Sequence, residues 1–160
     1  MNTRLTATAL LLVLGAGTLG AVGGKKMAYV GGTLTGIAEK AEGTVTTSGE
    51  VIALDAEKKG SIAIPYSAIT ELEYGQKAGR RVAVAVLVSP LALFSKKRNH
   101  YLTITYKDAS GTEQAGVFEL GKDIVRTTLK VLEVRTGKEI AFQDEEACKQ
   151  YKTPKECTGK

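Results

Sequence analysis

The fold is decided by one stretch, YLTITYKDASGTEQAGVFEL, at residues 101–120. Apolar and polar side chains alternate on both sides of a short polar segment, which is the period of two strands that each bury one face. The side chains expected to point inward are Leu102, Ile104, Tyr106, Phe118 and Leu120. Those expected to point outward from the first strand are Tyr101, Thr103 and Thr105.

The polar segment between the two strands has the chemistry of a turn. Asp108 can accept hydrogen bonds from the backbone of the residues that follow it, and Gly111 tolerates a positive φ. The stretch therefore predicts an antiparallel β-hairpin.

Shorter apolar runs upstream of the hairpin predict further strands. They lie at residues 27–35, 43–47, 51–55, 61–64 and 69–74. Gly31 and Gly32 indicate a bend or a close backbone approach in the first run. Pro65 ends or bends the fourth run because proline has no N–H to donate.

The last of these runs alternates along its length. Thr70, Leu72 and Tyr74 are expected to share one face of the strand. Glu71 and Glu73 share the other face, where they could crowd one another and raise a pKa, but a solvated strand face is favoured over a catalytic acid pair.

An amphipathic helix is predicted directly after the hairpin. Its apolar stripe consists of Ile124, Val125, Thr128, Leu129, Val131 and Leu132. Asp123 is expected to cap its N-terminus, and Gly137 suits the left-handed residue that follows a helix. After Phe142 the chain becomes polar, so residues 143–160 are expected to form a tail outside the core.

This order of elements resembles the pleckstrin-homology-like fold. The stretch SIAIPYSAITELEYG, residues 61–75, is similar to the strand–turn–strand element of bacterial and GRAM-type members, and the hairpin and helix resemble the family's last strands and cap. The resemblance covers residues 27–137. It implies a mainly β domain at residues 25–142, a bent antiparallel barrel of six to seven strands capped by the C-terminal helix.

The amino-acid sequences of two segments also resemble those of a group of small exported bacterial proteins. These segments are EYGQKAGRR, residues 73–81, and LTITYKD, residues 102–108. Phosphoinositide binding is not carried over from the fold family, because residues 33–44 contain only Lys40 as a cation, with Glu39 and Glu42 beside it. Fold similarity alone does not assign a ligand.

Residues 1–24 predict a secretory signal peptide. A short basic start at Arg4 precedes an apolar stretch, which is followed by small residues up to Gly24. The alternatives are an uncleaved N-terminal anchor and a buried segment of the fold. Export with cleavage is favoured because the apolar stretch is shorter than the ~20 residues that a membrane-spanning helix needs.

An apolar run bounded by cations lies between the upstream strands and the hairpin. Residues 82–94 carry no charge, and a basic cluster lies on either side of them. The candidate binding residues are Lys77, Arg80, Arg81, Phe94, Lys96, Lys97 and Arg98. Residues 77–98 contribute +6 to the formal charge of +5, which leaves −1 for the rest of the chain. The basic character of the protein is therefore confined to this segment.

Three interpretations of this segment are open. It is a core strand or helix with charged ends, or it meets an anionic membrane surface, where each cation adds about 1 kcal/mol. In the third, it is an exposed patch for a protein partner or for self-association. Nucleic acid is not expected, because the basic clusters lack interleaved aromatic residues.

Cys148 and Cys157 are expected to form a disulfide that pins the polar tail, provided that the chain is exported to an oxidising compartment. Such a loop would add about 2–3 kcal/mol of stability. Free or intermolecularly paired thiols are the alternative.

No motif indicates catalysis, metal binding or a cofactor. His100 is the single histidine, and no Gly-x-Ser-x-Gly motif is present. The sequence therefore predicts an exported, periplasmic or extracellular, non-enzymatic binding module that acts through residues 77–98 on an anionic membrane surface or a protein partner. A structural or protein-interaction domain with the apolar run in its core is the first alternative, and a hydrolase that uses His100 is the second.

Overall fold

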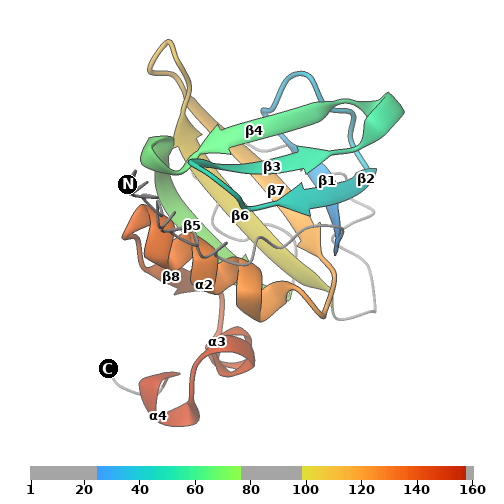
Figure 1. Cartoon of the computed structure of the whole chain (residues 1–160). Coiled ribbons are helices and arrows are strands. Elements are labelled where there is room, and N and C mark those ends of the chain that lie inside the picture. The colour runs from blue at the N-terminus through green and yellow to red at the C-terminus, as the bar shows by residue number, and fades with distance from the viewer. Residues whose placement is uncertain (1–24, 77–98, 158–160) are drawn as a thin grey trace, which may run out of the picture.

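The computed structural model describes residues 25–76 and 99–157 (Figure 1). The strands are β1 (Lys25–Gly32), β2 (Ala41–Thr46), β3 (Val51–Asp55), β4 (Ser61–Pro65), β5 (Ile69–Gly75), β6 (His100–Lys107), β7 (Glu113–Leu120) and β8 (Ile140–Phe142). The α-helices are α2 (Val125–Thr136), α3 (Glu145–Tyr151) and α4 (Pro154–Cys157). Two short 3-10 helices, η1 (Glu57–Lys59) and η2 (Tyr66–Ala68), flank β4.

The eight described strands form one sheet in the order β4-β3-β2-β1-β7-β6-β5-β8. The mainly β class and the C-terminal helix are confirmed. The sheet is open, however, because β4 and β8 are its two ends and do not pair with each other, so a closed barrel is not formed. The prediction of six or seven antiparallel strands also did not include β8, which runs parallel to β5. A three-residue strand carries too little alternation to be recognised from sequence.

The sheet bends so that its β2–β3–β4 half faces its β5–β6–β7 half, with α2 at the opening between them (Figure 1). Apolar side chains from both halves meet in one core. Its fully buried members include Val45, Leu54, Ile64, Leu72, Tyr74, Leu102, Ile104, Phe118, Leu129 and Leu132. The helix therefore seals the concave side of the sheet, as its apolar stripe predicted.

The predicted hairpin is confirmed as β6 and β7. Leu102 pairs with Phe118, and every pair is in register from one end of the hairpin to the other. In the turn, Asp108 Oδ1 accepts hydrogen bonds from the backbone N–H of Ser110 at 2.9 Å and of Thr112 at 3.0 Å. Gly111 has a φ of +82°. The turn therefore forms for the reasons read from its sequence.

The prediction for β5 was wrong at one residue. The β5–β6 register shifts between Ile69 and Glu71, so the strand contains an irregularity at Thr70. Ile69 and Leu72 are both buried in the core, whereas the Thr70 hydroxyl donates to the Thr105 carbonyl at 3.2 Å. A bulge of this kind breaks strict alternation, and strict alternation was the basis of the prediction.

Helix α2 ends as predicted but starts differently. Gly137 is left-handed, with a φ of +65°, and its N–H donates to the Glu133 carbonyl at 3.0 Å. The N-cap position is occupied by Ile124 and not by Asp123, and the Ile124 side chain makes no capping hydrogen bond. Burial of Ile124 and Val125 fixes the start of the helix instead.

The polar tail is partly inside the fold, which corrects the expectation that it lies outside the core. Asp144 caps α3 by accepting from the Ala147 N–H at 2.8 Å, and Ala147 is fully buried in the core. Tyr151 donates to Glu133 Oε2 on α2 at 2.8 Å. The predicted Cys148–Cys157 disulfide is present, with a Cα–Cα distance of 5.8 Å. It joins α3 to α4.

Candidate functional site

The predicted contact residues occupy the connection between β5 and β6. Lys77, Arg80, Arg81, Phe94, Lys96, Lys97 and Arg98 all lie outside the described residues. The structure does place both ends of the connection, because Gly75 is the paired neighbour of Tyr101 in the antiparallel β5–β6 ladder. The chain therefore leaves the sheet and returns to it at the same end. We call this the β5–β6 loop end; it is opposite to the turn of the β6–β7 hairpin.

Two lysines of other elements lie near the β5–β6 loop end. His100 pairs with Leu120, so the β7–α2 connection with Lys122 begins beside it. Lys26 on β1 accepts a hydrogen bond at its carbonyl from the Gly121 N–H at 3.1 Å. The described residues thus place two further lysines, Lys26 and Lys122, near the point where the cationic connection departs.

His100 is paired with a tyrosine at this end. Its Nδ1 lies 2.6 Å from the Tyr74 hydroxyl, and the two rings are nearly parallel, with their centroids 6.1 Å apart. Burial and the charge of Lys122 lower the pKa of His100, and burial raises the pKa of Tyr74 to about 12. Both groups are therefore uncharged at neutral pH. The contact positions the start of β6 and supplies no charge.

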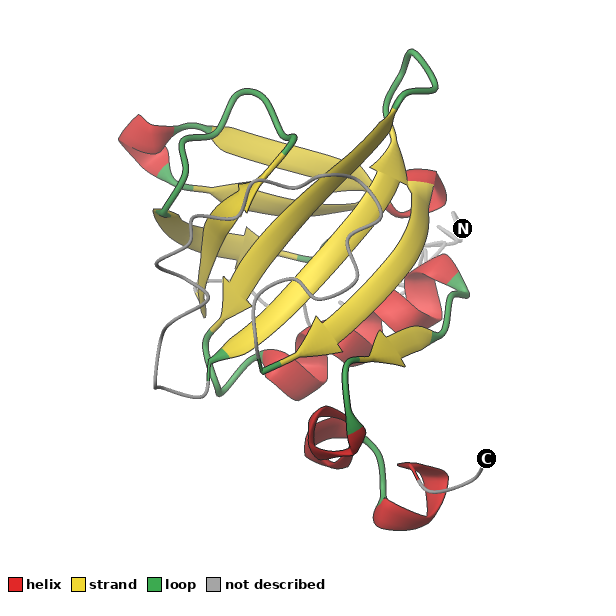
Figure 2. Ribbon diagram, turned by 180° about the vertical axis from the view of Figure 1, so that it is seen from behind, coloured by secondary structure: helices red, strands yellow, loops and turns green. Residues whose placement is uncertain are grey.

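The side of β5, β6 and β7 that faces away from α2 is more buried than the sequence predicts. Its residues form three rows across these strands, and we call them the outer face. The rows are Glu71, Thr105 and Ala115; Glu73, Thr103 and Val117; and Gly75, Tyr101 and Glu119. Alternation along each strand puts them opposite the core residues. Figure 2 looks onto this side of the sheet.

Most of the outer face is buried. Tyr101 is 4% exposed, Thr103 5% and Thr105 9%, whereas Ala115 and Val117 are fully buried. Glu73 Oε1 is also buried and, in the described part of the chain, has no hydrogen-bond partner. Burial raises the pKa of Glu119. Of the two acids expected on a solvated face, Glu71 is exposed, whereas Glu73 is half-buried.

The described helices do not account for this burial. The apolar members of the outer face are separate from the core that α2 joins, and Figure 2 shows no described helix over this side of the sheet. The Gln143 side chain covers the corner at Gly75, where an added Cβ would overlap it. Asn99 Nδ2 donates to the Tyr101 hydroxyl at 3.3 Å. These two side chains cover only the row nearest the β5–β6 loop end, which contains Gly75 and Tyr101.

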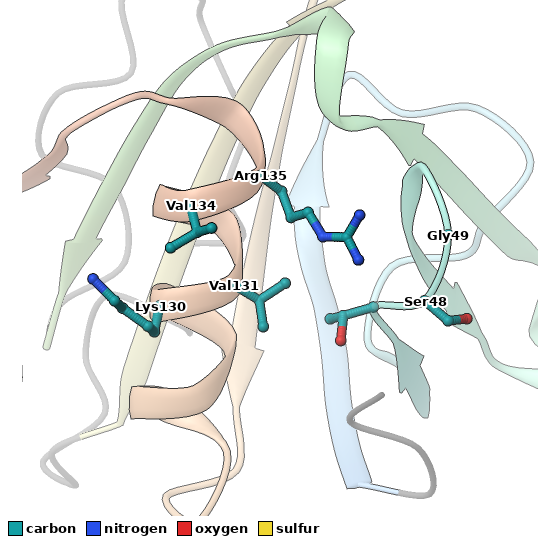
Figure 3. Close-up of a pocket in the computed structure, with 7 residues that line it drawn as sticks. Ser48, Gly49, Lys130, Val131, Val134 and Arg135 are labelled. Atoms are coloured by element: carbon teal, nitrogen blue, oxygen red, sulfur yellow. The ribbon is translucent and has the colours of Figure 1, made fainter. Parts of the chain in front are cut away.

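A groove that was not predicted from the sequence lies between α2 and the β2–β3 turn (Figure 3). It encloses about 390 Å³ and is lined by Thr47, Ser48, Gly49, Lys130, Val131, Val134 and Arg135. Its cations are engaged within the fold: Lys130 Nζ lies 3.3 Å from Glu133, and Arg135 lies over the Tyr66 ring. Val134 is 67% exposed, and its place outside the apolar stripe of the helix is the sequence signal for this groove.

Comparison with models of known protein families finds no match, and comparison with curated protein sequences finds none either. Among residues 25–76 and 99–157, no cluster of three His, Cys, Asp or Glu side chains is arranged to hold a metal ion. None of the described helices is long and apolar enough to span a membrane.

Proposed function

We propose that this chain is an exported, non-enzymatic binding domain that associates with an anionic membrane surface through the cations of residues 77–98. The observation that carries the proposal is the distribution of charge. That segment holds six cations and no acid, while the rest of the chain is close to neutral. Cations near an anionic bilayer contribute about 1 kcal/mol each, so binding requires that they act together.

The position of the connection supports joint action. Gly75 and Tyr101 are paired, so the first cluster, from Lys77, and the second, ending at Arg98, both begin within three residues of one end of the sheet. Near that end the described residues place Lys26 and Lys122, together with the half-buried Glu119. Two clusters that are distant in sequence can therefore meet one surface.

The disulfide and the strand order support the rest of the proposal. A disulfide between Cys148 and Cys157 is typical of proteins in oxidising compartments, in agreement with export to the periplasm or the cell exterior. A bent sheet sealed by one helix also favours kinship with pleckstrin-homology-like domains, although the sheet is open. Members of one fold bind unlike ligands, so the proposed target rests on the charge of residues 77–98 and not on the fold.

Vesicle flotation tests the proposal. The chain is mixed with phosphatidylcholine vesicles that contain or lack phosphatidylglycerol. The variant carries Gln in place of the six cations Lys77, Arg80, Arg81, Lys96, Lys97 and Arg98. We expect the unaltered chain to float only with the anionic vesicles and to be released by salt, and the variant to lose binding by more than about a hundredfold.

A matched control keeps the total charge change equal. It carries Gln at six exposed lysines elsewhere, namely Lys40, Lys58, Lys59, Lys107, Lys138 and Lys155. We expect this control to bind nearly as well as the unaltered chain. Equal flotation of both variants, or no flotation of the unaltered chain, would contradict the proposal and would favour a protein partner.

A further inference from the structure

We infer that the groove between α2 and the β2–β3 turn, which we name the α2 groove, binds a medium-chain fatty acid or a similar unbranched carboxylic acid. The carboxylate meets Arg135, and the hydrocarbon chain lies along Val131 and Val134. The site uses none of residues 77–98, and it does not rest on the proposed membrane association.

The helix side of the α2 groove is apolar. Val131, Val134 and Arg135 are three and four positions apart on α2, so they share one flank of the helix. Val131 packs against the edge of the core, whereas Val134 is the one large hydrophobic side chain that is exposed among the described residues. A hydrocarbon chain laid over Val134 removes apolar surface from water. The enclosed volume of about 390 Å³ is within the usual range of small-molecule sites.

The Arg135 guanidinium is held in place and keeps its charge. Its Cζ lies 5.8 Å from the centroid of the Tyr66 ring, and burial raises the pKa of Tyr66, so this ring is uncharged at neutral pH. Figure 3 shows Arg135 and Val131 both pointing from α2 toward the β2–β3 turn. Stacking uses the flat face of the guanidinium and leaves the N–H groups at its edge for a carboxylate, which arginine can bind through two parallel hydrogen bonds.

Glu50 is the acid that pairs with Arg135 among the described residues, and it is a weak competitor. Its Oε1 lies 3.9 Å from Arg135 Nη1, which is too long for a hydrogen bond. The Glu50 side chain is 93% exposed, whereas that of Arg135 is 33% exposed. Exposed ion pairs contribute little to stability. A ligand carboxylate that reaches Arg135 from within the groove therefore displaces Glu50 at small cost.

The end of α2 is partly neutralised where the anion binds. Carbonyl groups at the C-terminus of a helix carry partial negative charge, which disfavours a nearby anion. Here the Thr136 hydroxyl donates to the Leu132 carbonyl at 2.7 Å, and the Gly137 N–H donates to the Glu133 carbonyl at 3.0 Å. Two of the last carbonyls of the helix therefore already have donors.

The backbone on both sides of the α2 groove favours a hydrocarbon chain over a peptide. On the turn side, the Thr47 carbonyl accepts from the Tyr66 hydroxyl at 3.1 Å, and the Glu50 carbonyl accepts from the Tyr66 N–H at 3.0 Å. On the other side, the backbone of α2 is bonded within the helix. A peptide would find few partners for its own N–H and C=O groups, which are costly to bury unpaired. A hydrocarbon chain has no such groups.

Calorimetric titration of the full-length chain with sodium decanoate, without vesicles, tests the site. We expect one decanoate to bind per chain, and octanoate to bind about fivefold more weakly because it buries two fewer methylene groups. Decylammonium has a similar chain with the opposite charge and should bind at least about tenfold more weakly. Absence of decanoate binding, or equal binding of decylammonium, would overturn the inference.

A dipeptide distinguishes the two kinds of carboxylate ligand. N-acetyl-valyl-leucine has a free carboxylate, apolar side chains and main-chain amides. We expect it to bind more weakly than decanoate. Tighter binding of the dipeptide would identify the occupant as the C-terminus of a peptide and would overturn the inference.

Variants of two cations on α2 locate the carboxylate. Arg135→Gln should weaken decanoate binding at least about tenfold, whereas Arg135→Lys keeps the charge, loses the paired hydrogen bonds and should weaken it less. Lys130→Gln is the matched control, because Lys130 points away from the turn in Figure 3 and pairs with Glu133. We expect it to change the affinity by less than about twofold. Equal losses in Arg135→Gln and Lys130→Gln would overturn the inference.

Glu50→Gln is the most selective variant because it is expected to improve binding. Removal of the competing carboxylate should tighten decanoate binding about threefold. A substitution that merely disturbed the β2–β3 turn would weaken binding instead. Circular dichroism confirms that each variant is folded. Unchanged or weaker binding by folded Glu50→Gln would contradict the position of the carboxylate at Arg135 and overturn the inference.

Discussion

The two sides of the β5–β6–β7 sheet are both largely buried, but they carry very different side chains. The inner side consists of large apolar groups, such as Leu72, Ile104 and Phe118, which pack against α2 and the β2–β3–β4 half. The outer face consists mostly of Thr, Ala, Val and Glu in the same strands, with Gly75 and Tyr101 in its last row. Burial on the inner side follows from hydrophobicity, whereas burial on the outer face depends on what lies against it.

The largest expected effect is on the inner side. Leu102→Ala removes a fully buried side chain from the centre of the core and leaves a cavity that the sheet cannot collapse around. We expect the free energy of unfolding to fall by about 3 kcal/mol, measured by urea denaturation. A loss below about 1 kcal/mol would mean that the two sides do not differ as described.

A smaller effect is expected on the outer face. Val117→Thr keeps the shape of the side chain and adds a hydroxyl in a fully buried position opposite Thr103. If the face is dry, the free energy of unfolding should fall by about 1–2 kcal/mol. Val134→Thr on exposed α2 is the matched control, with an expected change within about 0.5 kcal/mol. Equal effects of the two substitutions would indicate a wet outer face.

The smallest effect is expected at the turn that holds both sides in register. Hydrogen bonds from Ser110, Gln114 and Thr112 lower the pKa of Asp108 from 3.8 to about 2. The native state therefore binds this proton less readily than the unfolded state, so the stabilisation is complete above pH 3.8 and lost as the pH falls through 2. Thermal unfolding of Asp108→Asn should show a shallower loss of stability across this acid range than the unaltered chain. Superimposable pH profiles would show that Asp108 does not contribute to the loss of stability at acid pH.

Local chemistry made much of the fold predictable. The hairpin followed from alternation and from Asp108 in its turn, and α2 followed from an apolar stripe that ends at Gly137. The disulfide was predicted from two cysteines nine positions apart in a chain that was expected to be exported. In each case, residues near one another in sequence carry the decisive interaction.

The remaining features depend on contacts between distant segments. Strand β8 exists because Ile140 meets Leu72, 68 positions earlier, and its three residues carry no period of their own. The bulge at Thr70 and the burial of Glu73 depend on neighbouring strands in the same way. Seen in sequence alone, Thr103 and Glu73 have the pattern of a wet sheet face, because alternation reports which residues face the core and not what covers the other side.

The open sheet has one more consequence, which concerns its ends. An unpaired edge strand offers free N–H and C=O groups to any second chain, and this is a common route to aggregation. Strand β8 limits the risk by being only three residues long. Strand β4 ends at Pro65, which has no N–H, and the backbone beside its start is engaged by Ile37, which bridges to Gly60. The protein thus remains open as a sheet while presenting little edge that another sheet could extend.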